Sequence, residues 1–192
     1  LDATIVEAVR ELRSQHDVTA VGLAAAGFIA PTRDIVSFAP NIAWRDYPLG
    51  KNVQDAVGLP TVVENDANAA GWAEFQFGIG RDVKHMVMVT IGTGTGGAII
   101  VNGHLLRGAF GVAGEIGHLK MVPHGHFCGC GHEGCWERYA SGQALTLAAR
   151  HRAITDPEGS RTMRELAGEG KKIKGQHVTT AAAAGDPAAI EI

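Results

Sequence analysis

The chain has 192 residues, of which 45% are hydrophobic and 19% charged, so it can bury a sizeable core and is not expected to be disordered. A formal net charge of -3, without any basic run interleaved with aromatic residues, argues against nucleic acid as a partner of this segment. No apolar stretch reaches the roughly 20 residues that span a bilayer, and the N-terminus lacks a secretion pattern. We therefore expect a cytoplasmic protein with no membrane partner.

Helical and strand patterns alternate through the first third of the chain. Apolar residues at helical spacing predict the first helix, and a glycine at position 58 predicts the end of the second. In chain order, the expected elements are a helix over 5–12, a strand over 18–23, a strand over 35–38, a helix over 48–57 and a strand over 61–63.

The alternation continues beyond residue 65. Asn102-Gly103 is a strong signal for a two-residue hairpin turn between two short strands. The expected elements are a helix over 67–77, strands over 86–91, 98–101 and 104–106, and helices after Ser141. Interleaved strands and helices predict an α/β fold, and a change of character near residue 65 indicates a domain junction there.

A glycine-rich segment, Ile91-Gly92-Thr93-Gly94-Thr95-Gly96-Gly97, lies between two apolar strands and is expected to form the tip of a hairpin. Glycines allow the backbone to approach a ligand closely and to point N–H groups at an anion, while the threonines offer hydroxyl groups. The segment is neither a Walker loop nor a dinucleotide fingerprint. A phosphate-binding hairpin and an ordinary glycine-rich turn are both consistent with this pattern.

Three consecutive polar residues, Glu64-Asn65-Asp66, follow the strand over 61–63 and enter a helix. One of them is expected to cap that helix, but three exceed what a cap requires. Ligands of α/β folds gather at the carboxyl ends of strands. An aspartate in this place is suited to accept a hydroxyl proton during phosphoryl transfer, so the segment fits either a cap or a catalytic base.

All three cysteines, Cys128, Cys130 and Cys135, lie within eight positions. A disulfide framework normally needs an even number of cysteines and wider spacing, so it is not favoured here. With a histidine they supply the thiolate and imidazole ligands of a closed, structural zinc site. His118 fits best as the fourth ligand, because it would join the cysteine loop to the preceding segment. His124, His126 and His132 remain alternatives, as do three reduced thiols without a metal.

Two glutamates flank the cysteine segment, in Gly114-Glu115-Ile116-Gly117-His118 and in Gly134-Cys135-Trp136-Glu137. Carboxylates in such places could accept hydrogen bonds from sugar hydroxyls. The simpler alternative for each is an exposed surface charge.

Taken in order, these motifs resemble the ROK family of bacterial sugar kinases and repressors. The resemblance covers roughly residues 18–145, and Ser37-Phe38-Ala39-Pro40-Asn41-Ile42-Ala43-Trp44 is most similar to its glucokinase branch. It implies an actin-like ATPase (ribonuclease H-like) two-domain α/β sugar kinase fold. Residues 1–65 would belong to the small N-terminal domain and 66–192 to part of the large domain.

The resemblance also implies roles for individual residues. Asp66 would be the base that deprotonates the 6-hydroxyl of glucose, and zinc on His118, Cys128, Cys130 and Cys135 would shape the sugar pocket. The substrate-binding residues would be Gly27, Asn41, Asn65, Glu115, His118 and Glu137. The donor, Mg-ATP, would bind near Gly92, Thr93, Gly94 and Gly96.

Two features of family kinases are missing from these residues: an N-terminal Asp-x-Gly-Gly-Thr loop and a glycine-rich segment near the adenosine. We therefore expect a piece of a kinase, with both ends cut, that is inactive by itself. The alternatives are a sugar-responsive repressor, or a kinase for N-acetylmannosamine or mannose. The oligomeric state is expected to be a homo-oligomer, and polyphosphate is an alternative donor.

Overall fold

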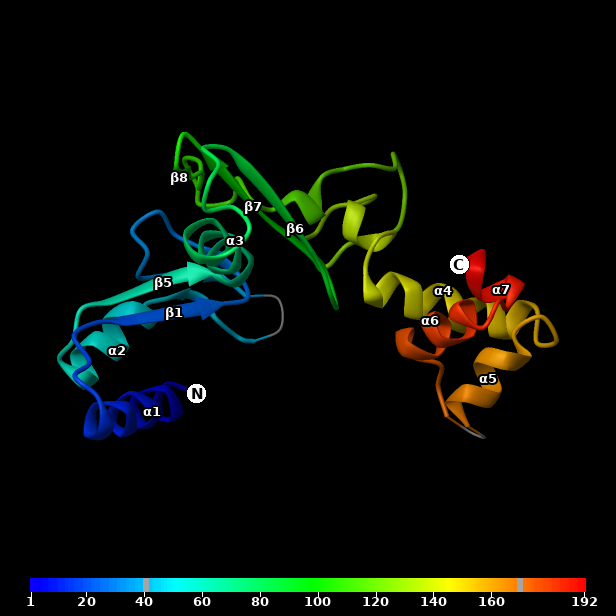
Figure 1. The fold of residues 1–192 in the computed structure, drawn as a ribbon, viewed down its shortest axis with the longest axis horizontal. Helices are drawn as coiled ribbons and strands as arrows, with labels where there is room; N and C mark the ends of the chain where they lie inside the picture. The colour runs from blue at the N-terminus through cyan, green and yellow to red at the C-terminus, as the bar shows by residue number, and fades with distance from the viewer. Residues whose placement is uncertain (40–41, 169–170) are drawn as a thin grey trace. The chain divides into compact units, whose positions relative to one another are not determined.

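The computed structural model describes residues 1–39, 42–168 and 171–192 (Figure 1). The predicted substrate residue Asn41 lies outside these ranges. The chain divides into two compact units, the first of residues 1–89 and 96–116 and the second of residues 90–95 and 117–192. Each has its own core, and the family domain boundary expected near residue 65 stays a prediction.

The first unit contains a parallel strand pair covered by helices. Its elements are α1 (Asp2–Gln15), β1 (Val21–Ala25), α2 (Leu49–Val57) and β5 (Thr61–Asn65). β1 lies beside β5 (Figure 1). In this parallel pair Val21 is opposite Thr61 and Ala25 is opposite Asn65. Apolar residues from α1, α2 and both strands form one buried cluster that includes Val53 and Val63. The expected helices and the α/β class are confirmed.

β1 begins later than the sequence predicts. The expected strand over 18–23 instead runs from Val21 to Ala25. Its ladder starts where the Val21 N–H donates to the Pro60 carbonyl at 2.8 Å, because the partner strand begins just after that proline. Pairing with Glu64 and Asn65 then extends the strand into the small residues that follow Leu23.

A three-stranded antiparallel sheet follows β1, with the order β2 (Phe28–Ile29), β3 (Val36–Phe38) and β4 (Arg45–Tyr47). Only β3 was expected from the sequence. The other two strands have two and three residues, too few to show a periodic pattern, and exist because they pair with β3.

The rest of the first unit is α3 (Asp66–Phe77) and most of a sheet of β6 (Met86–Ile91), β7 (Thr95–Val101) and β8 (His104–Leu105). Residues 90–95, at the tip of the β6–β7 hairpin, belong to the second unit. Asn102 and Gly103 have φ of 52° and 78°, as the predicted two-residue turn requires. β7 is longer than the expected 98–101, and β8 ends one residue earlier than expected. Along β6 burial alternates, so that Val87 is 64% exposed although the strand is apolar on both faces.

The second unit holds the cysteine segment and a helical cluster. Its elements are η2 (Trp136–Arg138), α4 (Gly142–Thr155), α5 (Arg161–Ala167), α6 (Gly175–Ala183) and α7 (Pro187–Ile190), while the short turn η1 (Ile116–His118) begins at the junction of the units. The buried core of this cluster consists of alanines together with Met163, Ile173 and Val178. Within the described part of the chain, none of the helices is both long enough and apolar enough to cross a bilayer.

Candidate functional site

At the junction of β5 and α3 the sequence left two roles open, a helix cap and a catalytic base, and the structure shows which residue is the cap. Asn65 is the N-cap of α3, since its side-chain oxygen accepts a hydrogen bond from the Asn68 N–H at 3.0 Å. Asp66 is the first residue of the helix and is exposed, with its Oδ1 accepting from the Ala67 N–H at 3.0 Å. The capping role therefore belongs to Asn65.

Asn65 also joins two other residues predicted to bind substrate. Its side-chain N–H group donates to the Gly27 carbonyl at 3.2 Å and to Glu115 Oε1 at 3.4 Å. A Cβ on Gly27 would lie 2.6 Å from the Phe38 carbonyl oxygen, so only glycine fits there. The first unit thus gathers Gly27, Asn65 and Glu115 into one polar cluster beside the start of α3.

Glu64 is central to this region, although the sequence did not single it out as a site residue. Its Oε2 accepts from Arg107 Nε at 2.8 Å and Nη2 at 2.7 Å, and Arg33 Nε lies 3.4 Å away. Its Oε1 accepts from the Asn65 N–H at 3.2 Å and from the Asn68 side chain at 3.3 Å. The buried Glu64 carboxylate therefore binds the residue before Asp66, through the Asn65 N–H, and a residue after it, through the Asn68 side chain.

In the second unit the structure selects His118 from the candidate histidines. The ligand atoms of His118, Cys128, Cys130 and Cys135 all lie within 4.8 Å of one another. Cys128 Sγ is 3.6 Å from His118 Nδ1, and the Sγ atoms of Cys130 and Cys135 are 3.6 Å apart. Two sulfurs bound to a tetrahedral zinc at about 2.3 Å lie roughly 3.8 Å apart, so the set fits a four-coordinate metal.

The thiol pKa values show how a metal would change this cluster. Burial raises the pKa of Cys128 to about 12 and also raises the pKa of Cys135. Burial opposes ionisation of Cys130 as well, but hydrogen bonds from the His132 backbone and side chain leave its pKa lowered. Since metal ligands are thiolates, binding must release the protons of Cys128 and Cys135, and metal affinity should rise with pH.

Glu137 lies beside the cysteine cluster on η2 and is partly buried. Its Oε1 accepts from Cys128 Sγ at 3.2 Å and lies 3.7 Å from His118 Nδ1. The carboxylate is therefore held by the predicted metal ligands, and the arrangement joins Glu137 and His118 into a second polar cluster.

The tip of the glycine-rich hairpin is fastened to the start of α4. The N–H of Gly142 donates to the Gly92 carbonyl at 2.8 Å, and the N–H of Gln143 donates to the Thr93 carbonyl at 3.1 Å. Gly92 and Thr93 are exposed and Gly94 is partly exposed. Gly96, the fourth residue expected near the donor, lies in β7 and belongs to the first unit.

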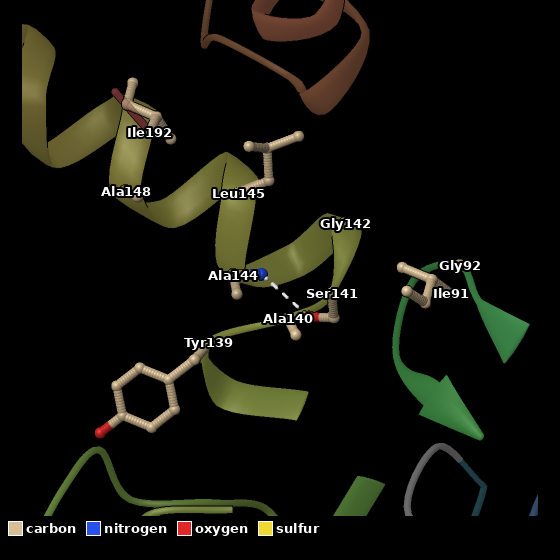
Figure 2. A pocket seen from close by; sticks show the side chains of 10 residues that line it. All are labelled: Ile91, Gly92, Tyr139, Ala140, Ser141, Gly142, Ala144, Leu145, Ala148 and Ile192. Atoms are coloured by element: carbon tan, nitrogen blue, oxygen red, sulfur yellow. Dashed lines mark hydrogen bonds between the residues drawn. The ribbon is translucent and has the colours of Figure 1, made fainter. Parts of the chain in front are cut away.

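A shallow pocket of about 320 Å³ opens beside this tip, and Figure 2 shows Ile91 and Gly92 on one side of it and Leu145 of α4 on another. The side chain of Ser141 caps α4 by accepting from the Ala144 N–H at 3.0 Å. None of the side chains that line the pocket is charged, so it suits an apolar or aromatic group better than an anion.

Comparison with known proteins adds the family context. The model of the ROK family matches residues 1–192. The glucokinase of Streptomyces coelicolor is 49% identical over 189 residues, which are 97% of this chain and 59% of that protein. The xylose repressor of Bacillus subtilis is 39% identical over 133 residues, which are 69% of this chain and 34% of that protein.

A crystal structure of a ROK family glucokinase from Streptomyces griseus, in complex with glucose and AMPPNP, matches with a TM-score of 0.84 and 48% identity. The match covers 98% of this chain and 62% of the other. The chain therefore spans about three fifths of the length of both glucokinases.

Proposed function

Since the chain belongs to the ROK family and has its actin-like ATPase fold, we propose that it carries the hexose site and catalytic base of a glucokinase. The protein would transfer the γ-phosphoryl group of ATP to the 6-hydroxyl of glucose. The similarity to two glucokinases at 48% and 49% identity supports this proposal over most of the chain.

The exposed carboxylate of Asp66 carries the proposal. Because Asn65 caps α3, the helix does not need Asp66 as a cap, and its side chain remains open to a ligand at the carboxyl end of β5. In the proposed reaction the 6-hydroxyl gives its proton to Asp66 while its oxygen bonds to the γ-phosphorus. The bond from that phosphorus to the bridging oxygen of ADP breaks. A positioned base of this kind contributes roughly 10²- to 10⁴-fold to the rate.

We assign hexose hydroxyls to the two polar clusters. Asn65 and Glu115 offer an amide and a carboxylate in the first unit, and their mutual hydrogen bond at 3.4 Å supports assigning them together. In the second unit we assign Glu137 and His118 to the same role. Carboxylates that accept hydrogen bonds from particular hydroxyls also discriminate between hexoses. A hexose whose hydroxyl points in another direction leaves the carboxylate without its hydrogen bond.

The closed set of three thiolates and one imidazole supports a structural rather than a catalytic metal, because no coordination position would remain for water. Zinc would crosslink the loop that carries its ligands and would fix the orientation of the His118 ring. We propose that Gly92, Thr93, Gly94 and Gly96 serve the phosphates of Mg-ATP.

The test measures ADP release by the purified full-length protein with magnesium-ATP and a panel of hexoses. We expect glucose-dependent ADP formation that falls at least roughly 100-fold in Asp66→Asn, while glucose affinity changes little. Asp82→Asn, which removes an exposed carboxylate of the first unit, is the matched control and should keep full activity. Full activity of Asp66→Asn would exclude Asp66 as the base.

A repressor is the second candidate, supported by 39% identity to the xylose repressor. A repressor requires the sugar site but no base. Hexose binding without ADP release from any sugar on the panel would favour it over the kinase.

A further inference from the structure

We propose that Gly94, at the tip of the glycine-rich hairpin, positions the hexose-binding carboxylate of Glu137. The glycine-rich hairpin would then shape the sugar site in addition to serving the donor. This inference rests on the proposed function, because it takes Glu137 as a ligand of the hexose.

The space beside Gly94 is filled by one atom. A Cβ built on Gly94 would lie 2.9 Å from Glu137 Oε2, closer than carbon and oxygen approach without bonding. No other described atom beyond its chain neighbours lies within 4 Å of that position. The φ of Gly94 is outside the left-handed region, so the backbone by itself would accept alanine. The far end of the Glu137 side chain is therefore the one described group that a methyl on Gly94 would have to displace.

The other side of Glu137 packs against the cysteine cluster. Its Oε1 lies 3.2 Å from Cys128 Sγ and 3.7 Å from His118 Nδ1, and Cys128 is fully buried. The hairpin tip is also fixed, because the Gly92 N–H donates to the Gly94 carbonyl at 2.9 Å and α4 holds the Gly92 carbonyl. A methyl group on Gly94 would thus displace mainly the Oε2 end of the glutamate, with little effect on the fold.

Gly92 provides the matched control. It lies in the same tip, has no atom within 4 Å of a built Cβ and is also outside the left-handed region of φ. Gly92→Ala adds the same methyl group without contacting Glu137. Both glycines are assigned to the donor phosphates, so an effect on the donor is common to both variants. An effect on hexose affinity is expected only for Gly94→Ala.

The experiment measures the Kd for glucose without nucleotide, by calorimetry on the full-length, zinc-loaded protein. We expect Gly94→Ala to weaken glucose binding roughly tenfold, which corresponds to the loss of one hydrogen bond to a charged group. Gly92→Ala should stay within about twofold, and melting temperature and zinc content should be unchanged in both. Equal glucose affinities for the two variants would overturn the proposal.

A double-mutant cycle with Glu137→Asp tests the mechanism, because the shorter side chain withdraws the carboxylate from the tip. In that background, Gly94→Ala should weaken glucose binding no further. If the two losses multiply instead, Gly94 acts by another route and the inference is wrong, while the kinase proposal stands. If Glu137→Asp alone leaves glucose affinity unchanged, both the inference and the assignment of Glu137 to the hexose fail.

Discussion

Three parts of the first unit meet at the carboxylate of Glu64. Arg33 comes from the turn between β2 and β3, Arg107 follows β8, and Asn68 lies in the first turn of α3. Arg107 donates to Oε2 and Arg33 Nε forms an ion pair with the same oxygen at 3.4 Å, while backbone and amide N–H groups donate to Oε1. The Glu64 side chain is only 11% exposed, so these charge-assisted bonds are poorly screened by solvent and should contribute measurably to stability.

Replacing this carboxylate tests its structural importance. We expect Glu64→Gln to lower the free energy of unfolding by about 1–3 kcal/mol, because two arginines lose their counter-charge. Asp55→Asn is the control: it breaks an exposed ion pair with Lys51 and should cost less than about 1 kcal/mol. Urea denaturation of both variants measures the difference, and equal midpoints would show that the Glu64 cluster contributes no more than a surface pair.

At the scale of the element, the cysteine loop depends on glycines that permit tight turns. Gly134 has a φ of 76°, and a Cβ there would lie 1.7 Å from the Val122 carbonyl oxygen. The loop is closed by backbone bonds as well, including one from the Cys128 N–H to the His132 carbonyl at 2.7 Å. Backbone geometry therefore helps to bring the candidate metal ligands of this loop together.

Two glycines of this loop make a matched pair of variants. Gly134→Ala should prevent the loop from closing and reduce bound zinc well below one equivalent, because both φ and space exclude a side chain. Gly129 has no atom within 4 Å of a built Cβ, so Gly129→Ala should bind zinc normally. Metal analysis after gel filtration measures both, and full zinc in Gly134→Ala would contradict the expected backbone requirement.

For the whole molecule, the decisive feature is that each unit has a separate core. The first unit buries Val53 and Val63 between helices and sheet, whereas the second buries Met163 among its helices. The four candidate metal ligands all lie in the second unit. Loss of metal should therefore affect one part of the chain and leave the other folded.

Hydrogen exchange after treatment with a zinc chelator tests this separation. Amides of residues 118–137 should lose protection because their loop loses its crosslink. Amides of β1 and β5 should keep theirs, because their strand ladder and core contain no metal ligand. Uniform loss of protection across both units would show that the cores unfold together.

The sequence by itself determined the features that depend on near neighbours. Helical spacing of apolar residues predicted α1, Gly58 predicted the end of α2, and Asn102-Gly103 predicted a turn, because these signals act over a few residues. The cysteines of the candidate metal site were also evident from the sequence, since three of them within one short segment favour a metal over a disulfide framework.

Only the tertiary structure decided what depends on residues far apart in the chain. It selected His118 from four candidates, set the start of β1 against Pro60 and paired Glu64 with Arg107, which is 43 positions away. It also showed that Asn65, rather than Asp66, caps α3. Such partners are chosen by packing and by the geometry of hydrogen bonds, and no local pattern in the sequence encodes them.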